Sequence, residues 1–92
     1  MSNAVLHVPL TTEGDFIRAL IARAGESYGV GVKEILSRYK GSNVQRARRA
    51  AMRLVRAEFP EMSWPQLGRV FGRHHSSVMY ACGALVSRQP KD

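Results

Sequence analysis

Residues 63–87 read SWPQLGRVFGRHHSSVMYACGALVS, and the fold prediction starts from this stretch. Ser63 followed three positions later by Gln66 is the pattern of a capping box, and the proline between them fits a first helical turn because its missing N–H has no partner there. Apolar residues then recur three or four positions apart on both sides of Gly72, a residue typical of a helix C-terminus. The stretch therefore predicts two helices joined by a short turn, over residues 63–71 and 75–87.

Three further helices are predicted upstream, over residues 13–28, 32–38 and 43–58. The last of these has its apolar residues on one arc of an ideal helical wheel, with four arginines on the opposite arc: Arg46, Arg49, Arg53 and Arg56. Arg48 falls at the edge of the apolar arc, and the wheel gives no reason for it. No segment alternates as a strand does. The fold class is therefore all-α, a small bundle of about five helices that contains a helix-turn-helix.

The chain is long enough for one domain with one core, which we place at residues 11–92 after a flexible leader at 1–10. No apolar run approaches the roughly 20 residues that span a bilayer, and the N-terminus lacks the pattern of a signal peptide. Cys82 is the single cysteine, so no disulfide can form within the chain. We expect a cytoplasmic protein that does not bind a membrane.

Positive charge is concentrated in one part of the chain. Fourteen Lys and Arg residues face seven Asp and Glu residues, which gives a net charge of +7. Residues 33–56 contain Glu34 as their one acidic residue and carry the whole excess through Lys33, Arg38, Lys40, Arg46, Arg48, Arg49, Arg53 and Arg56. A surplus that served solubility alone would be scattered. A localised, arginine-rich surface instead favours forked hydrogen bonds to phosphate, and hence a nucleic-acid partner.

A helix, a short glycine-containing turn and a second helix make a helix-turn-helix, which places the start of its second helix in the major groove. That start carries four hydrogen-bonding side chains, those of His74, His75, Ser76 and Ser77. We expect them to contact base edges. Together with the basic helix upstream, they predict double-stranded DNA as the partner.

Residues 64–78 resemble the signature of the C-terminal DNA-binding domain of the bacterial replication initiator DnaA, in which a small apolar helix is followed by Phe-Gly-(Gly)-Arg-Asp-His-Thr/Ser-Thr/Ser-Val. The pair Ala81-Cys82 stands where this family often has Ala-Cys, and residues 32–37 resemble its short helix before a basic loop. Arg46, Arg48 and Met52 also fall where the family has Arg, Arg and Met. The resemblance covers roughly residues 16–88.

The resemblance implies a division of labour on DNA. His74, His75, Ser76 and Ser77 would read bases in the major groove, and Lys40 would enter the minor groove where the family has an arginine. Family phosphate contacts would map to Arg48, Arg56, Trp64 and Gln66. With the remaining arginines, the expected phosphate contacts are Arg38, Arg46, Arg48, Arg49, Arg53, Arg56, Trp64, Gln66 and Arg73.

Three departures from the family pattern bear on the target sequence. His74 replaces an Asp, which exchanges an acceptor for a possible donor to guanine or phosphate. Lys40 replaces an Arg and loses the planar fork. One glycine of the turn is missing.

The chain lacks the Gly-rich loop of an ATPase, so we favour a transcription regulator that binds a specific duplex site. A replication-initiation module, or an accessory factor to an initiator elsewhere, is the alternative, with another protein supplying the activation. A basic protein-interaction module is the alternative from another class. We expect no enzyme and no cofactor, since Ser76 beside His75 lacks a third catalytic member, and no metal, since His7, His74, His75 and Cys82 do not form a ligand set.

Overall fold

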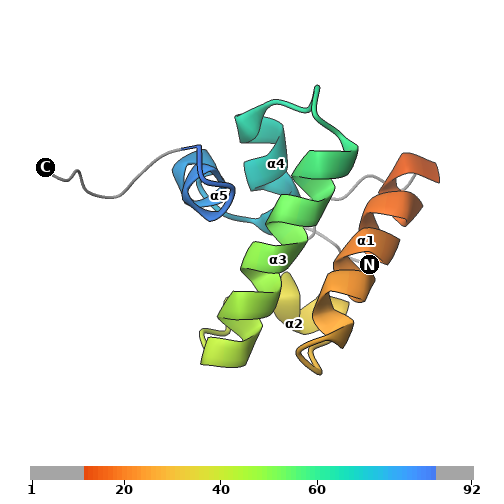
Figure 1. Ribbon diagram of the computed structural model, residues 1–92, viewed down its shortest axis with the longest axis vertical. Coiled ribbons are helices and arrows are strands. Elements are labelled where there is room, and N and C mark those ends of the chain that lie inside the picture. The colour runs from red at the N-terminus through yellow and green to blue at the C-terminus, as the bar shows by residue number, and fades with distance from the viewer. Residues whose placement is uncertain (1–11, 85–92) are drawn as a thin grey trace, which may run out of the picture.

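A computed structural model describes residues 12–84 of the chain. All the regular secondary structure of this part is α-helix, which confirms the all-α prediction. Its five helices are α1 (Thr12–Glu26), α2 (Val32–Ile35), α3 (Ser42–Glu58), α4 (Trp64–Phe71) and α5 (His75–Ala81). Figure 1 shows α1 and α3 running side by side in opposite directions, with α2 at the start of α3 and with α4 and α5 toward its other side. No helix between residues 12 and 84 is long and apolar enough to cross a membrane.

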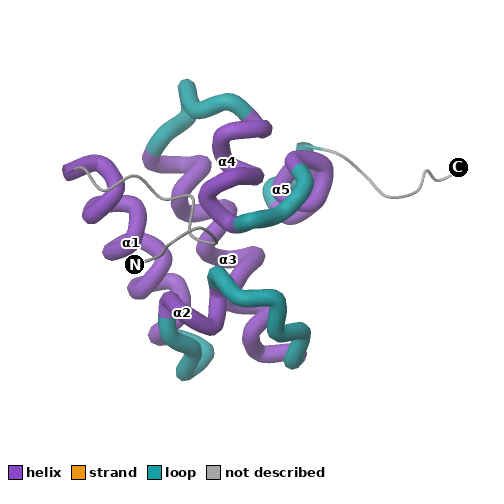
Figure 2. Tube along the Cα trace, turned by 180° about the vertical axis from the view of Figure 1, so that it is seen from behind, coloured by secondary structure: helices purple, strands orange, loops and turns teal. Residues whose placement is uncertain are grey.

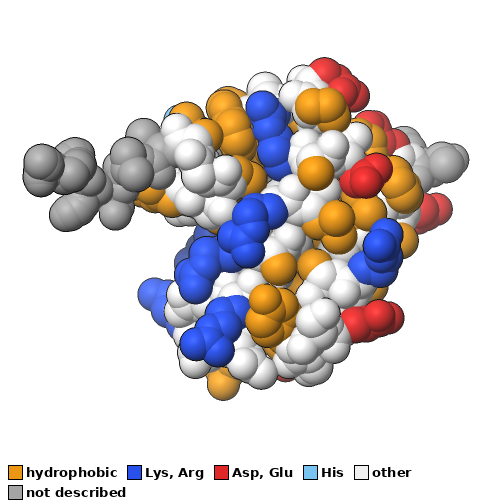
Figure 3. Space-filling model, viewed as in Figure 1, with side chains coloured by type: hydrophobic (Ala, Val, Ile, Leu, Met, Phe, Trp, Pro, Cys, Tyr) orange, Lys and Arg blue, Asp and Glu red, His pale blue; other side chains and the backbone are white. Residues whose placement is uncertain are grey.

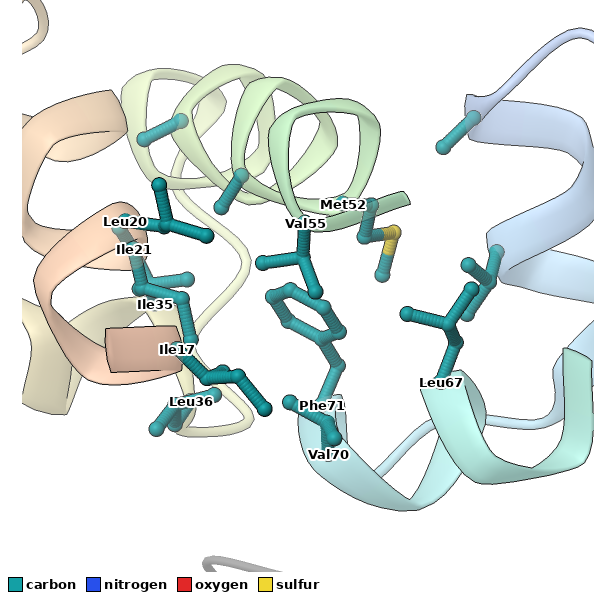
Figure 4. Close-up of a cluster of buried hydrophobic side chains, with 14 of the residues drawn as sticks. Ile17, Leu20, Ile21, Ile35, Leu36, Met52, Val55, Leu67, Val70 and Phe71 are labelled. Atoms are coloured by element: carbon teal, nitrogen blue, oxygen red, sulfur yellow. The ribbon is translucent and has the colours of Figure 1, made fainter. Parts of the chain in front are cut away.

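The core forms where α1 and α4 pack onto the apolar face of α3. Figure 4 shows Phe71 of α4 pointing toward Val55 of α3, with Ile17 of α1 beside them. All three side chains are at most 1% exposed. Each large apolar side chain buried in this way contributes about 1.5–3 kcal/mol. The helix-turn-helix is therefore held by the same core that holds α1 and α3.

The connection between α4 and α5 has the predicted caps. Gln66 N donates to Ser63 Oγ over 3.2 Å, and Ser63 N donates to Gln66 Oε1 over 2.9 Å, which confirms the capping box. Gly72 ends α4 in the left-handed region with φ 63°. A side chain at Gly68 would place its Cβ 2.6 Å from the carbonyl oxygen of Arg73, so glycine lets α4 lie close to the turn.

Three helices end earlier than the sequence predicted, and the first is α1, which ends at Glu26 and not at residue 28. α2 ends at Ile35 and not at residue 38, and α5 ends at Ala81 and not at residue 87. Gly83, with φ 77°, follows the end of α5. The predicted leader at 1–10 lies outside the described residues, as do residues 85–87 of the last predicted helix.

Candidate nucleic-acid interface

Arg48 is buried inside the molecule, with 5% of its surface exposed. Its Nε donates to the carbonyl oxygen of Ile35 over 2.7 Å. Its Nη2 donates to the carbonyl oxygens of Glu34, Ser37 and Tyr39 over 3.3, 3.1 and 3.0 Å. These bonds replace the continuation of α2 and hold residues 36–41 in a defined loop. Arg48 thus positions the loop from inside the molecule, which explains its place beside the apolar arc, and its contact with a phosphate stays a prediction.

A second arginine joins this loop to the helix-turn-helix. Arg73 Nη2 donates to the carbonyl oxygen of Ser37 over 3.1 Å, and Arg73 lies in the turn before α5. Figure 2 shows this turn and the connection between α2 and α3 on the same side of the molecule. Burial, and then the positive charge of Arg73, lower the pKa of Arg48 to about 10, so Arg48 remains charged at neutral pH. The result is a pair of neighbouring cations.

Two of the predicted phosphate-binding arginines are also partly engaged within the protein. Arg53 Nη1 donates to the carbonyl oxygen of Ala81 at the end of α5 over 3.1 Å. Arg56 Nη1 donates to the carbonyl oxygen of Met62 over 2.8 Å, and its guanidinium carbon lies 4.2 Å from the ring centroid of Trp64. Trp64 therefore packs against Arg56 at the start of α4.

The remaining basic residues of this region are exposed and unpaired. Among residues 12–84 the one ion pair joins Arg18 to Asp15 on α1. Within the described residues, no side-chain hydrogen bond is made by five exposed basic residues: Lys33, Arg38, Lys40, Arg46 and Arg49. Figure 3 shows the basic side chains gathered in a band over α3 toward α5. Cations without acidic partners are available for phosphate.

The start of α5 has a defined hydrogen-bonding pattern. His74 is the N-cap of the helix, and its Nδ1 accepts from the backbone N–H of Ser76 over 3.2 Å. With Nδ1 as the acceptor, a neutral His74 ring carries its proton on Nε2, which is then a donor. The His75 ring stacks beside it, with the centroids 4.2 Å apart. His74 and Ser77 are exposed, whereas His75 and Ser76 are half-buried.

A groove of about 320 Å³ lies between α3 and α5. Its walls include Gln45, Arg48, Arg49, Arg73, Ser77 and Tyr80. The structure thus brings together side chains predicted for phosphates and one predicted for bases. Trp64 and Gln66 do not line this groove.

Gln45 escaped the sequence reasoning. Its Nε2 donates to the carbonyl oxygen of Lys40 over 2.8 Å and so fixes the loop that presents Lys40. No sequence signal marks this bond. Within residues 12–84 there is also no cluster of three His, Cys, Asp or Glu residues that could hold a metal ion.

The chain matches one protein family and a group of curated proteins. The family described as Bacterial dnaA protein helix-turn-helix matches residues 17–84. The chain is 32% identical over 89 residues to the chromosomal replication initiator protein DnaA of Synechocystis sp., covering 96% of this chain and 20% of that protein. It is 42% identical over 77 residues to the protein of the same name from Streptococcus pyogenes serotype M5, covering 83% of this chain and 17% of that protein.

No solved structure matches the chain. The chain spans about a fifth of the length of these curated relatives. The match at residues 17–84 covers all of α2 to α5 and most of α1. The chain therefore belongs to the family of the bacterial DnaA helix-turn-helix domain.

Proposed function

We propose that this domain binds duplex DNA, with the start of α5 in the major groove and with basic side chains of α3 and of the loop before it on the phosphates. The observation that carries the proposal is the exposed, unpaired set Arg38, Lys40, Arg46 and Arg49 beside the helix-turn-helix. The bonds of Arg48 and Arg73 to Ser37 support it, because they fix the loop relative to the turn. The loop before α3 and the start of α5 would then contact DNA at a fixed distance from each other.

The proposed contacts are exposed or half-buried side chains of α3, of the loop before it and of the start of α5. Arg38, Arg46, Arg49 and Arg73 would bind phosphates, and Lys40 would reach into the adjacent minor groove. Arg53 and Arg56 would contribute charge while keeping their bonds to Ala81 and Met62. His74, Ser76 and Ser77 would face base edges, with His75 supporting His74 from behind through the ring stack.

We infer that this binding serves initiation of replication. The relatives are named chromosomal replication initiators, which supports the replication alternative over the transcription regulator that we expected from the sequence. The chain would act on chromosomal DNA in the bacterial cytoplasm and would need other segments or another protein for any ATP-driven step. We propose a binding role and no catalytic one.

Salt dependence and a matched pair of double variants test the proposal. The logarithm of the binding constant should fall with the logarithm of the salt concentration, with a slope of about −0.9 per phosphate contact. Arg46→Ala/Arg49→Ala should reduce the magnitude of this slope by about two and weaken every duplex alike.

The control is Arg23→Ala/Arg69→Ala, which removes the same charge from exposed positions on α1 and α4. It should leave the slope close to that of the wild type. If both double variants lower the slope equally, net charge and not this surface attracts DNA. If the chain binds an acidic protein and ignores duplex DNA, the protein-interaction alternative is correct.

A further inference from the structure

A second groove, of about 490 Å³, lies between the start of α1, the connection from α3 to α4, and α4 itself. Its lining combines apolar and acidic side chains: Ile17, Phe59, Met62, Val70, Glu13 and Glu61. Its volume is within the roughly 300–1,000 Å³ range of ligand pockets. The proposed DNA contacts leave the groove without a function.

Gly68 and the residues of α4 that line the second groove lie on different faces of that helix. Gly68 of α4 faces the turn at Arg73 and His75, with its missing Cβ 2.6 Å from one backbone atom there. Arg69 and Val70, which line the second groove, project about 100° and 200° away from Gly68 on an ideal helix. The two grooves share no lining residue. Both could therefore be occupied at once.

The charge of the second groove is opposite to that of the DNA face. Glu13 and Glu61 are exposed at its rim, and Arg69 is its one basic lining residue. Figure 3 shows acidic side chains over α1 and over the connection from α3 to α4, apart from the basic band. An acidic rim repels DNA and anionic lipid alike. A symmetric contact between two copies would bring these carboxylates against each other.

Apolar surface continues beyond the groove. Phe16 is 47% exposed, although most large apolar side chains of α1 are buried. Its ring lies edge-on to that of Phe59, with the centroids 5.7 Å apart at 67°. Exposed aromatic side chains beside a concave apolar surface are typical of the centre of a protein interface.

We propose that the second groove binds a cationic amphipathic segment of a partner protein, with its apolar side chains on Phe16, Phe59 and Met62 and a Lys or Arg on each of Glu13 and Glu61. The argument rests on charge complementarity and on the apolar floor. It is independent of the proposed DNA binding. A bound partner segment would leave α5 accessible to DNA.

A synthetic helical peptide tests this inference. The probe is a 15-residue peptide of Leu and Lys with leucines at positions i, i+3, i+4 and i+7, and the matched peptide has Glu in place of Lys. Binding is followed by backbone amide NMR shifts of the ¹⁵N-labelled chain. The Leu/Lys peptide should shift residues around Phe16, Phe59 and Met62, and the Leu/Glu peptide should bind about tenfold more weakly.

Charge reversal separates this site from general attraction. Glu13→Lys/Glu61→Lys should weaken the Leu/Lys peptide about tenfold. Glu26→Lys/Glu34→Lys, exposed acids that do not line the groove, has the same net charge and should keep wild-type peptide affinity. Circular dichroism melts of both variants check folding.

Several results would overturn the inference. These are no binding at millimolar peptide, equal binding of the two peptides, equal loss in the two double variants, or shifts confined to α5. Peptide binding that requires removal of residues 1–11 would make the chain's own N-terminal segment the occupant. Concentration-dependent dimerisation lost in Glu13→Lys/Glu61→Lys would make it a second copy. If the wild-type chain does not bind duplex DNA but binds the Leu/Lys peptide, the proposed function is wrong and this inference still holds.

Discussion

The guanidinium groups of Arg48 and Arg73 donate to the same acceptor, the carbonyl oxygen of Ser37, over 3.1 Å each. One arginine belongs to α3 and the other to the turn before α5. Their shared acceptor lies in the loop that carries Arg38 and Lys40. The position of this loop relative to α5 is therefore set by two buried or half-buried cations.

Replacing Arg48 should destabilise the fold. Arg48→Met keeps the length of the side chain but leaves the carbonyl oxygens of Ile35 and Tyr39 without their side-chain donor, and that of Ser37 with Arg73 alone. Hydrogen bonds from charged groups are worth about 1.5–3 kcal/mol each, so we expect the free energy of unfolding to fall by about 3 kcal/mol. Urea denaturation measures it. Arg49→Met on the exposed face is the control and should stay within about 0.5 kcal/mol; equal stability of both variants would contradict the role of Arg48.

A methyl group at Gly68 should separate α4 from the turn. In Gly68→Ala the new Cβ would lie 2.6 Å from the carbonyl oxygen of Arg73, which is backbone and can yield only if the turn moves. Overpacking of this kind costs about 1–3 kcal/mol of unfolding free energy. Thermal melts should show the loss. Arg69→Ala, exposed and next in sequence, should melt near wild type; a stabilised Gly68→Ala would mean that helix propensity outweighs the close contact.

His74→Asp should change base preference without unfolding the helix. Aspartate is also a good N-cap, so the start of α5 is kept. The carboxylate accepts hydrogen bonds where the Nε2 of His74 would donate one. On the duplex site selected by the wild type, we expect a loss of about 1–3 kcal/mol in binding free energy, that is about 5–150-fold. Fluorescence anisotropy on that site measures the loss.

Replacing single guanines of the site with 7-deazaguanine identifies the base. One such replacement should weaken the wild type and leave His74→Asp unaffected, since N7 is the acceptor that is lost. Equal sensitivity of the two proteins at every guanine would show that His74 does not read this base.

The thiol of Cys82 should react slowly near neutral pH. Burial raises its pKa above the ordinary 9.0, against the lowering effect of Arg56 and Arg53. Because the thiolate is the nucleophile, alkylation by iodoacetamide at pH 8 should be slower than that of free cysteine in urea-unfolded chain.

The raised pKa of Cys82 also sets the direction in which its contribution to stability changes with pH. As pH rises above about 9, the unfolded thiol loses its proton before the folded one, so the contribution of Cys82 to stability falls with increasing pH. Cys82→Ala should remove this part of the pH dependence between pH 8.5 and 10. A faster reaction in the folded chain than in the unfolded one would reverse the assigned direction.

The features of the fold that could be predicted from the sequence are those that depend on contacts within one helical turn. The capping box of Ser63 and Gln66, the glycine that ends α4 and the three-to-four spacing of apolar residues all act between near neighbours, so they placed the helix starts and the turn but not every helix end. The concentration of positive charge on residues 33–56 is likewise a property of the sequence alone.

Which of these basic side chains are bonded within the protein depends on contacts between residues far apart in the sequence. Arg48 finds acceptors 9–14 residues away, and Arg73 finds one 36 residues away, so no local pattern could predict either bond. Three of the Arg48 acceptors lie at or just beyond the end of α2. The acidic groove likewise depends on packing, since Glu13 and Glu61 meet only when α1 lies against the connection from α3 to α4.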